Sequence, residues 1–357
     1  MAVQVIVAGF HRSGTSLTAQ ILHRAGLFLG DRMLSEHASN PHGHFEDLEV
    51  LELHERILAD NGLTWQVCGS SSLAIGELHR RQMQDLAGRR NAEHRLWGFK
   101  DPRVCLFLET WKEILPESKV LLVYRDPVRV CRSLHRRHAE HAIRGGDETS
   151  LHYRFWKVPD LALKMWLTYN RALLRFARTH REDVLAVSMD MLRDGLPLVN
   201  VLNERWELGL HEVPTSGVFD AGATARDREG HPVSNEDIIS EAAEVWEELE
   251  EIGQRTRRLA GMPEALHRLN VGDEGLYVPR EAYSHRMDAE FLSFKVRFLE
   301  ELLKQEGKRF VPLKRLSELE AAERDLKYIL HRMSRSRFAP LFRLKRGFRI
   351  LEKRYLS

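Results

Sequence analysis

The sequence predicts an α/β protein in which a parallel sheet with a phosphate-loop-like turn is flanked by helices, with a mainly helical C-terminal region. The run 3–8 (VQVIVA) is short and β-branched, the pattern of a buried parallel strand. A turn with two glycines follows at 9–16. From Thr15, apolar residues recur at helical spacing until Gly26, a typical helix stop. A strand, a glycine turn and a helix in this order predict a nucleotide-binding sheet.

The rest of the chain continues the alternation. Further strand candidates are separated by helical stretches, which favours a mostly parallel sheet covered on both faces. Residues 217–235 are rich in small, turn-forming and charged residues, so we expect a loop there. The predicted strands are 96–100, 119–124 and 184–188, and the predicted helices include 48–57, 106–115, 161–178, 236–259 and 281–303.

Composition suits either one large globular domain or one domain with an appendage. The chain has 357 residues, 43% of them hydrophobic, and 54 Lys and Arg against 52 Asp and Glu, so its total charge says little about partners. Residues 326–357 hold ten Lys or Arg and one acid, Glu352, so the basic excess is C-terminal. We predict a domain at 1–311 and a helical, basic amphipathic tail at 312–357.

Three cysteines without close spacing form no disulfide framework and fit a reducing compartment. The N-terminus MAVQVIVAGF lacks the pattern of a signal peptide, and no stretch reaches the ~18 apolar residues of a membrane-spanning helix. We therefore expect a cytoplasmic protein.

Residues 9–16 (GFHRSGTS) have the frame of a phosphate-binding loop. Glycines allow a tight turn in which backbone N–H groups and the helix N-terminus converge on an anion. A nucleotide kinase would carry Lys where Thr15 stands, and the nearby cation here is Arg12. Ser16 could hold magnesium, but the strand 119–124 ends in Arg125 instead of an acid. The loop therefore suits phosphate binding better than ATP hydrolysis.

These motifs resemble those of the PAPS-dependent sulfotransferases, especially the bacterial branch that acts on carbohydrates (PAPS is 3′-phosphoadenosine 5′-phosphosulfate). The loop Arg12-Ser13-Gly14-Thr15-Ser16 matches the family's 5′-phosphosulfate loop. Arg125 and Ser133, eight residues apart after a strand, match its 3′-phosphate motif. The segments 40–46 (NPHGHFE), 100–103 (KDPR) and 188–192 (SMDML) are further similarities. The late Arg-Lys-Gly-x-x-Gly element of the cytosolic enzymes is absent, which leaves part of the 3′-phosphate contact unassigned.

The resemblance implies a sulfotransferase fold, PAPS as co-substrate, adenosine 3′,5′-bisphosphate (PAP) as product and no metal. It implies that the backbone of 13–16 holds the 5′-phosphate. Arg12 and Lys100 then stabilise charge on the leaving phosphate, and Arg125 and Ser133 hold the 3′-phosphate. The alternative for Lys100 is a salt bridge with Asp101, and for Arg125 one with Asp126.

A neutral hydroxyl is a weak nucleophile and needs a general base. Glu46 is our candidate, because carbohydrate members of the family use a Glu shortly after the phosphate loop. Glu46 and Asp47 could instead cap the helix that follows. His11 and His44 are rival bases.

Three further sequence features are weaker evidence of function: a group of histidines, two arginines and the basic tail. His135, His138 and His141 lie three apart on a predicted helix, but adjacent arginines argue against a metal site. Arg129 and Arg132 are predicted to form a solvated helix face. The basic tail lacks a nucleic-acid recognition motif, and its apolar residues within 338–356 favour contact with a membrane surface or a partner. The alternative is a helix packed on the body.

The sequence thus predicts transfer of a sulfuryl group to the hydroxyl of a glycan, lipid-linked sugar or other cell-envelope precursor at the inner membrane face. Two alternatives remain open. One is a phosphate-loop kinase that uses ATP and magnesium. The other is a non-catalytic nucleotide-binding assembly protein.

Overall fold

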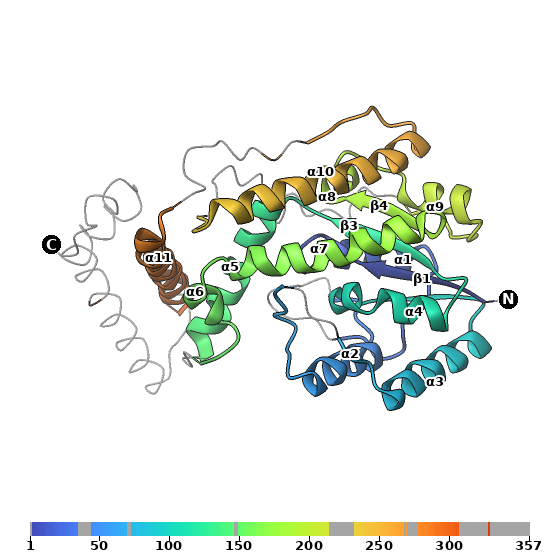
Figure 1. Ribbon diagram of the computed structural model, residues 1–357, viewed down its shortest axis with the longest axis horizontal. Helices are drawn as coiled ribbons and strands as arrows, with labels where there is room; N and C mark the ends of the chain where they lie inside the picture. Colours follow the sequence, from blue (N-terminus) through green and yellow to red (C-terminus); the bar gives the residue numbers. More distant parts are fainter. Residues whose placement is uncertain are drawn as a thin grey trace. The chain divides into compact units, whose positions relative to one another are not determined.

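The computed structural model contains a four-stranded parallel sheet with the order β2-β1-β3-β4 (Figure 1). The structure describes residues 2–34, 44–69, 73–145, 149–213, 232–267, 269, 278–306 and 328. The strands have the bounds that the sequence predicts, which confirms the α/β class. They are β1 (Val3–Ala8), β2 (Leu96–Lys100), β3 (Lys119–Tyr124) and β4 (Val184–Ser188).

The register of the sheet decides which residues meet at the C-terminal ends of its strands. Val7 pairs with Lys100, Ala8 with Leu122, and the last residues of β3 and β4 face each other. Because parallel strands end at the same edge, the segments that follow them converge there. The phosphate loop, the segment after β2 and the starts of two helices therefore come together.

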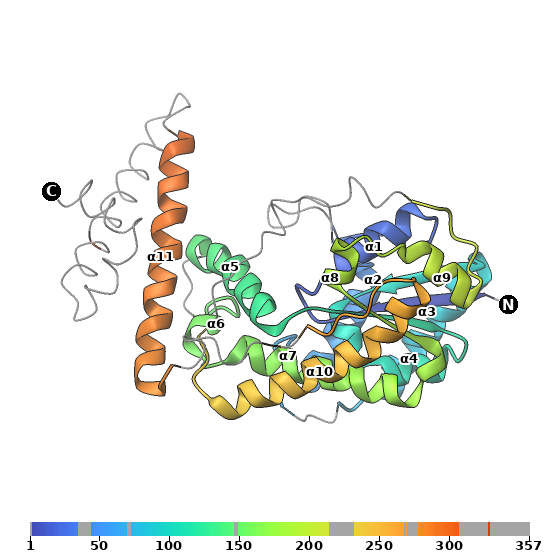
Figure 2. The ribbon, with the colours of Figure 1, turned by 90° about the horizontal axis from the view of Figure 1, so that it is seen from above.

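Helices cover both faces of the sheet. α1 (Thr15–Arg24) lies on one face, and α7 (Leu161–Thr179) and α10 (Glu236–Leu259) lie on the other (Figure 2). α10 approaches β3 closely at Gly253, where a methyl group would collide with the Tyr124 hydroxyl. The predicted helices 161–178 and 236–259 are thereby confirmed.

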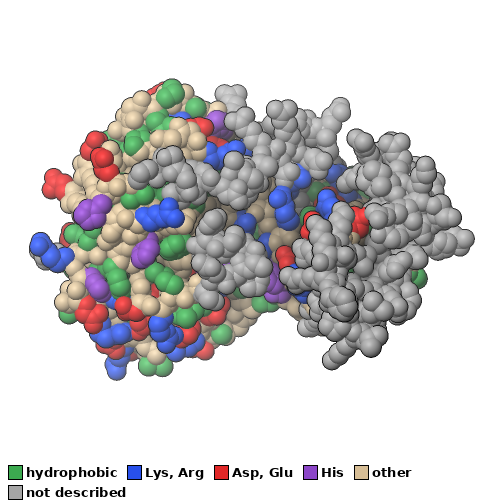
Figure 3. Space-filling view, turned by 180° about the vertical axis from the view of Figure 1, so that it is seen from behind, with side chains coloured by type: hydrophobic (Ala, Val, Ile, Leu, Met, Phe, Trp, Pro, Cys, Tyr) green, Lys and Arg blue, Asp and Glu red, His purple; other side chains and the backbone are tan. Residues whose placement is uncertain are grey.

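The connecting segments add shorter helices. The predicted helix 106–115 is confirmed as a helix over Leu108–Ile114, and the 3₁₀ turn Pro102–Leu106, capped by Asp101, precedes it. Acidic and basic side chains are mixed on the surface at the lower left of Figure 3. Arg80, in the helix 77–93, forms an ion pair with Glu113. These elements are α2 (Leu48–Asp60), α3 (Glu77–Glu93), η1 (Pro102–Leu106), α4 (Leu108–Ile114), η2 (Arg181–Asp183), α8 (Met189–Arg193) and α9 (Leu198–Trp206).

The chain divides into two compact units. The first comprises 1–134 and 160–277 and contains the whole sheet. The second comprises 135–159 and 278–357. Three helices supply its described part: the end of α5 (Pro127–Gly145), α6 (Arg154–Lys157) and α11 (Arg280–Glu306).

Aromatic packing holds the described part of the second unit together. The Trp156 ring lies 5.1 Å from that of Phe291 and 5.6 Å from that of Phe294, both on α11. His138 Nδ1 lies 2.8 Å from His152 Nδ1, and the His135 Nε2 atom lies 2.9 Å from the Phe155 carbonyl oxygen. These histidines therefore contact one another and the backbone.

Two predicted features lie outside the described residues: most of the loop 217–235, and the tail 312–357 apart from Tyr328. Within the described part of the chain, every helix is too short or too polar to cross a membrane.

Candidate active site

The phosphate loop (residues 9–16) connects the end of β1 to the start of α1. Arg12 and Gly14 have φ angles of 68° and 101°, in the left-handed region. A Cβ at Gly14 would also lie 2.6 Å from the sulfur of Met189, so this position requires glycine. The Ser13 hydroxyl is buried and has no hydrogen-bond partner among the described residues. A buried unsatisfied hydroxyl beside a helix N-terminus fits a phosphate group.

Arg12 connects the two motifs that are far apart in the sequence. Its Nε atom donates to Ser133 Oγ of α5 at 2.9 Å. Arg125 Nη1, just after β3, donates to the Arg12 carbonyl oxygen at 3.2 Å. Burial, followed by the nearby Arg129 guanidinium, lowers the pKa of Arg125. Its Nε atom is buried without a partner among the described residues, so this edge of the sheet favours an anion.

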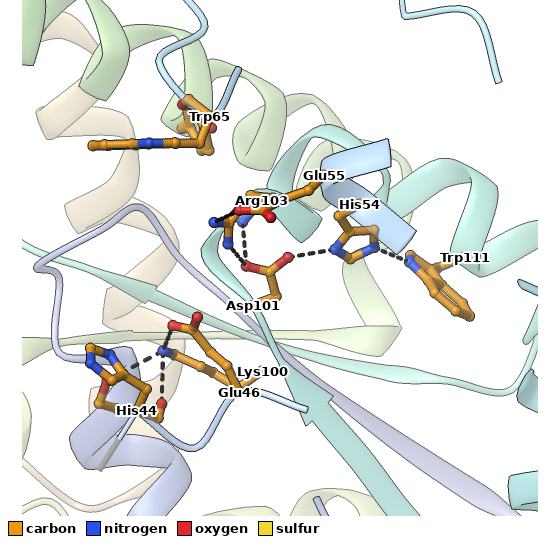
Figure 4. Close-up of polar contacts among 11 residues, drawn as sticks. His44, Glu46, His54, Glu55, Trp65, Lys100, Asp101, Arg103 and Trp111 are labelled. Atoms are coloured by element: carbon orange, nitrogen blue, oxygen red, sulfur yellow. Dashed lines mark hydrogen bonds and ion pairs between the residues drawn. The ribbon is translucent and has the colours of Figure 1, made fainter. Parts of the chain in front are cut away.

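Lys100, the last residue of β2, has three acceptors (Figure 4). Its Nζ atom donates to Glu46 Oε1 at 2.5 Å, to the His44 carbonyl oxygen at 3.0 Å and to Ser16 Oγ at 3.2 Å. Lys100 and Glu46 are both buried, with 1% and 7% of their surface exposed. Ser16 belongs to the phosphate loop, so the Lys100–Glu46 pair lies directly beside that loop.

The sequence allows Glu46 to cap α2 and Lys100 to pair with Asp101, but the structure gives both residues other contacts. Asp47 caps α2, because its carboxylate accepts a hydrogen bond from the backbone N–H of Glu49 at 3.0 Å. Asp101 points away from Lys100 and forms other contacts (Figure 4). Glu46 and Lys100 pair with each other instead.

Both rival bases also lie at this site. The backbone of His44 contacts Lys100, and its side chain is buried. The His11 ring lies 4.8 Å from the Trp65 ring and 6.1 Å from the Tyr169 ring. Position alone therefore does not select Glu46 over the two histidines.

A buried hydrogen-bond network behind Lys100 was not predicted. The Trp111 indole N–H donates to His54 Nε2 at 2.9 Å, and the other ring nitrogen, Nδ1, lies 2.6 Å from Asp101 Oδ2 (Figure 4). Because Nε2 must accept from the indole, the proton of the neutral ring belongs on Nδ1. This tautomer allows His54 to donate to Asp101.

The network continues to Arg103. Asp101 Oδ1 accepts from Arg103 Nη1 at 2.7 Å, and Arg103 Nη2 donates to Glu55 at 2.7 Å. Burial alone would raise the pKa of Asp101, but the charge of Arg103 and the hydrogen bond from His54 outweigh burial and lower it. Sequence motifs could not reveal His54, because it belongs to α2 and meets Asp101 only in the folded chain.

Trp65 forms an aromatic border beside the phosphate loop. The other six tryptophans are buried, whereas Trp65 is partly exposed. The Tyr169 hydroxyl donates to the Trp65 carbonyl oxygen at 2.6 Å, and the Trp65 ring contacts His11 of the loop. The α7 residue Tyr169 therefore fixes Trp65 next to the site.

Within the described residues, no group of three or more His, Cys, Asp or Glu side chains could hold a metal ion. The similarity at 40–46 falls partly outside the described residues, which resume at His44.

Comparison with known proteins places this geometry in context. A model described as the sulfotransferase family matches residues 4–192, more than half of the chain. Among curated proteins, none matches. One similar solved structure is that of retinol dehydratase in complex with androsterone and the inactive cofactor PAP. Its TM-score is 0.29 and its sequence identity 12%, over 82% of this chain and 79% of that one.

Proposed function

The chain belongs to the sulfotransferase family, and we propose that it transfers a sulfuryl group from PAPS to a hydroxyl of a glycan or another cell-envelope precursor. The observation that carries the donor assignment is the contact of Arg12 with both Ser133 and Arg125. This contact joins a phosphate loop to a second phosphate-binding motif more than a hundred residues away. A donor with phosphates at both the 3′ and the 5′ position of its ribose fits such a site.

The phosphate loop would hold the donor's 5′-phosphate. The backbone N–H groups of 13–16 and the start of α1 supply donors, and the buried Ser13 hydroxyl supplies one more. Arg12 and Lys100 would stabilise the negative charge that builds on the bridging oxygen as the S–O bond breaks. In-line transfer requires mainly this positioning and charge stabilisation.

Glu46 would act as the general base. Its carboxylate takes the proton of the acceptor hydroxyl while the acceptor oxygen bonds to sulfur, and PAP leaves with the electron pair of the broken S–O bond. The contact of Lys100 with both Glu46 and Ser16 supports this role, because it places the carboxylate beside the phosphate loop. His11 and His44 are the remaining candidates.

Trp65 supports a ring-shaped acceptor. A partly exposed indole next to a phosphate loop offers an apolar face on which a sugar ring could stack while its hydroxyls remain hydrogen-bonded elsewhere. Membrane contact through 338–356 and a position at the inner membrane face are proposed from the sequence alone. So is the boundary between the domain 1–311 and the tail.

Calorimetric titration with PAP, beside ATP with magnesium, tests the proposed function. We expect tight PAP binding without metal, and loss of that binding in Arg125→Ala. Preference for ATP with magnesium would favour the kinase instead. PAP binding without sulfuryl transfer to any acceptor in a broad screen would favour the non-catalytic assembly protein.

A further inference from the structure

Two arginines from different helices share one carboxylate near Arg125. Arg129 Nη1 donates to both oxygens of Asp190, at 3.0 and 3.2 Å, and Arg193 Nη1 donates to Asp190 Oδ1 at 3.1 Å. Arg129 lies in the first turn of α5, and Asp190 and Arg193 belong to α8. Since β3 and β4 are neighbours in the sheet, the helices that follow them start side by side. Arg129 is therefore held in place by α8, contrary to the prediction of a merely solvated helix face.

This group has more positive than negative charge. The strongest electrostatic influences on Arg125 come from two carboxylates, Asp126 and Asp190, and two like charges, Arg129 and Arg193. Asp126 also accepts a hydrogen bond from the backbone N–H of Arg129 at 2.9 Å. Among these groups, three guanidinium groups stand against two carboxylates. One positive charge is thus left for an anion.

Arg129 and Arg193 have N–H groups beyond those that contact Asp190. Asp190 engages Nη1 of both Arg129 and Arg193, and a guanidinium has five N–H donors, so the fork of each can reach a further oxygen. Their side chains are 29% and 20% exposed, half-buried but open to a ligand. Planar forks of this kind match the oxygens of a phosphate group.

We propose that Arg129 and Arg193, oriented by Asp190, bind the donor's 3′-phosphate together with Arg125. This inference rests on the proposed function, because it takes PAPS as the donor. A phosphate monoester carries about two negative charges at neutral pH, so it is attracted to a cluster with a net positive charge. The two arginines supply the cationic contact that the sequence leaves unassigned when the late Arg-Lys-Gly-x-x-Gly element is absent. Asp190 is a positioning residue, since it acts through the two guanidinium groups.

The test compares two ligands that differ only in the 3′-phosphate. Wild type, Arg129→Gln and Arg193→Gln are titrated by calorimetry with PAP and with adenosine 5′-monophosphate. Each variant should bind PAP at least about tenfold more weakly, the usual effect of losing a charged hydrogen bond. Affinity for the monophosphate should change by less than about twofold. Arg178→Gln is the matched control, because Arg178 also pairs with a carboxylate, Glu248, on an exposed surface.

Each outcome has one meaning. Equal losses for both ligands, or no loss for PAP, would overturn the proposal and leave the cluster as a link between α5 and α8. If a Gln variant fails to fold, Arg193→Lys keeps the charge without the planar fork, and it should still weaken PAP binding selectively. Failure of wild type to bind PAP would instead refute the proposed function, so the two failures are distinguishable.

Discussion

Lys100 and Glu46 form a buried ion pair, with 2.5 Å between Nζ and Oε1, and Lys100 also contacts Ser16 of the loop between β1 and α1. A buried charge left without its partner is costly, so the pair holds both groups in one place. The pair also connects the end of β2 to the segment that enters α2. If Glu46 is the base, Lys100 lies between it and the phosphate loop. From there it can stabilise the negative charge that builds on the leaving phosphate.

Glu46→Gln should lower kcat by about 10²–10⁴, the range expected for loss of a general base, and should keep PAP affinity near that of wild type. The amide retains the size of the side chain and can still accept from Lys100. The measurement is release of PAP with a working acceptor, together with calorimetry. Glu52→Gln, which alters an exposed pair with Arg32, is the control. Full turnover by Glu46→Gln would transfer the role of base to His11 or His44.

Gly14→Ala should weaken PAP binding at least about tenfold. Its φ of 101° strains any other residue, and the new Cβ would press on Met189, so the loop must shift its N–H groups away from the phosphate. Calorimetry with PAP measures the effect. Gly88→Ala is the control, because a Cβ at that helical position meets nothing within 4 Å. Unchanged PAP affinity in Gly14→Ala would mean that the loop does not hold the donor.

Asp101→Asn should destabilise the protein by about 3–5 kcal/mol at neutral pH, because it leaves Arg103 without one of its buried partners. The pKa of Asp101 is lowered in the folded state, so its contribution is complete above the unfolded-state pKa near 4 and is lost as the pH falls towards the folded value. The difference in Tm between wild type and variant should therefore shrink below about pH 4. Thermal unfolding from pH 3 to 7 measures it.

The control for that experiment is Asp60→Asn, which changes an exposed carboxylate paired with His79. Its effect on Tm should be small across the whole pH range. A constant gap between wild type and Asp101→Asn down to pH 3 would contradict the assigned role of the Arg103 and His54 contacts.

Trp65→Ala should raise the KM for a sugar acceptor about tenfold or more and leave kcat and PAP affinity nearly unchanged. The expected loss is that of one aromatic stacking contact together with its buried apolar area. Trp65→Phe should restore most of the affinity. Steady-state kinetics with an accepted glycan measure both variants. A fall in kcat without a change in KM would place Trp65 outside the acceptor site.

Replacing Arg343, Lys345, Arg346 and Arg349 with Gln should release the protein from vesicles that contain anionic phosphatidylglycerol. Each basic residue near such a surface contributes about 1 kcal/mol to binding. Cosedimentation with these vesicles, compared with vesicles of neutral phosphatidylcholine, measures the effect. Wild type that binds neither kind of vesicle would refute membrane contact through 338–356.

The sequence by itself determined where the strands begin and end and where the phosphate loop lies. The strands Val3–Ala8 and Lys119–Tyr124 are continuous apolar runs, and the loop between β1 and α1 needs glycine at position 14. Such local patterns depend on residues close together in the chain, so they can be identified without a structure. Arg12, Arg125 and Ser133 could be named because the short motifs that contain them resemble those of the sulfotransferases.

Only the tertiary structure decided how these residues are paired. Glu46 contacts Lys100 while Asp47 caps the helix, although the two acids are adjacent and equivalent as sequence signals. His54 meets Asp101, and Arg129 meets Asp190, from elements distant in the chain. The strand order and helix packing bring these partners together, and burial then favours the pairing of opposite charges and of donors with acceptors. Local patterns carry no information about such long-range partners.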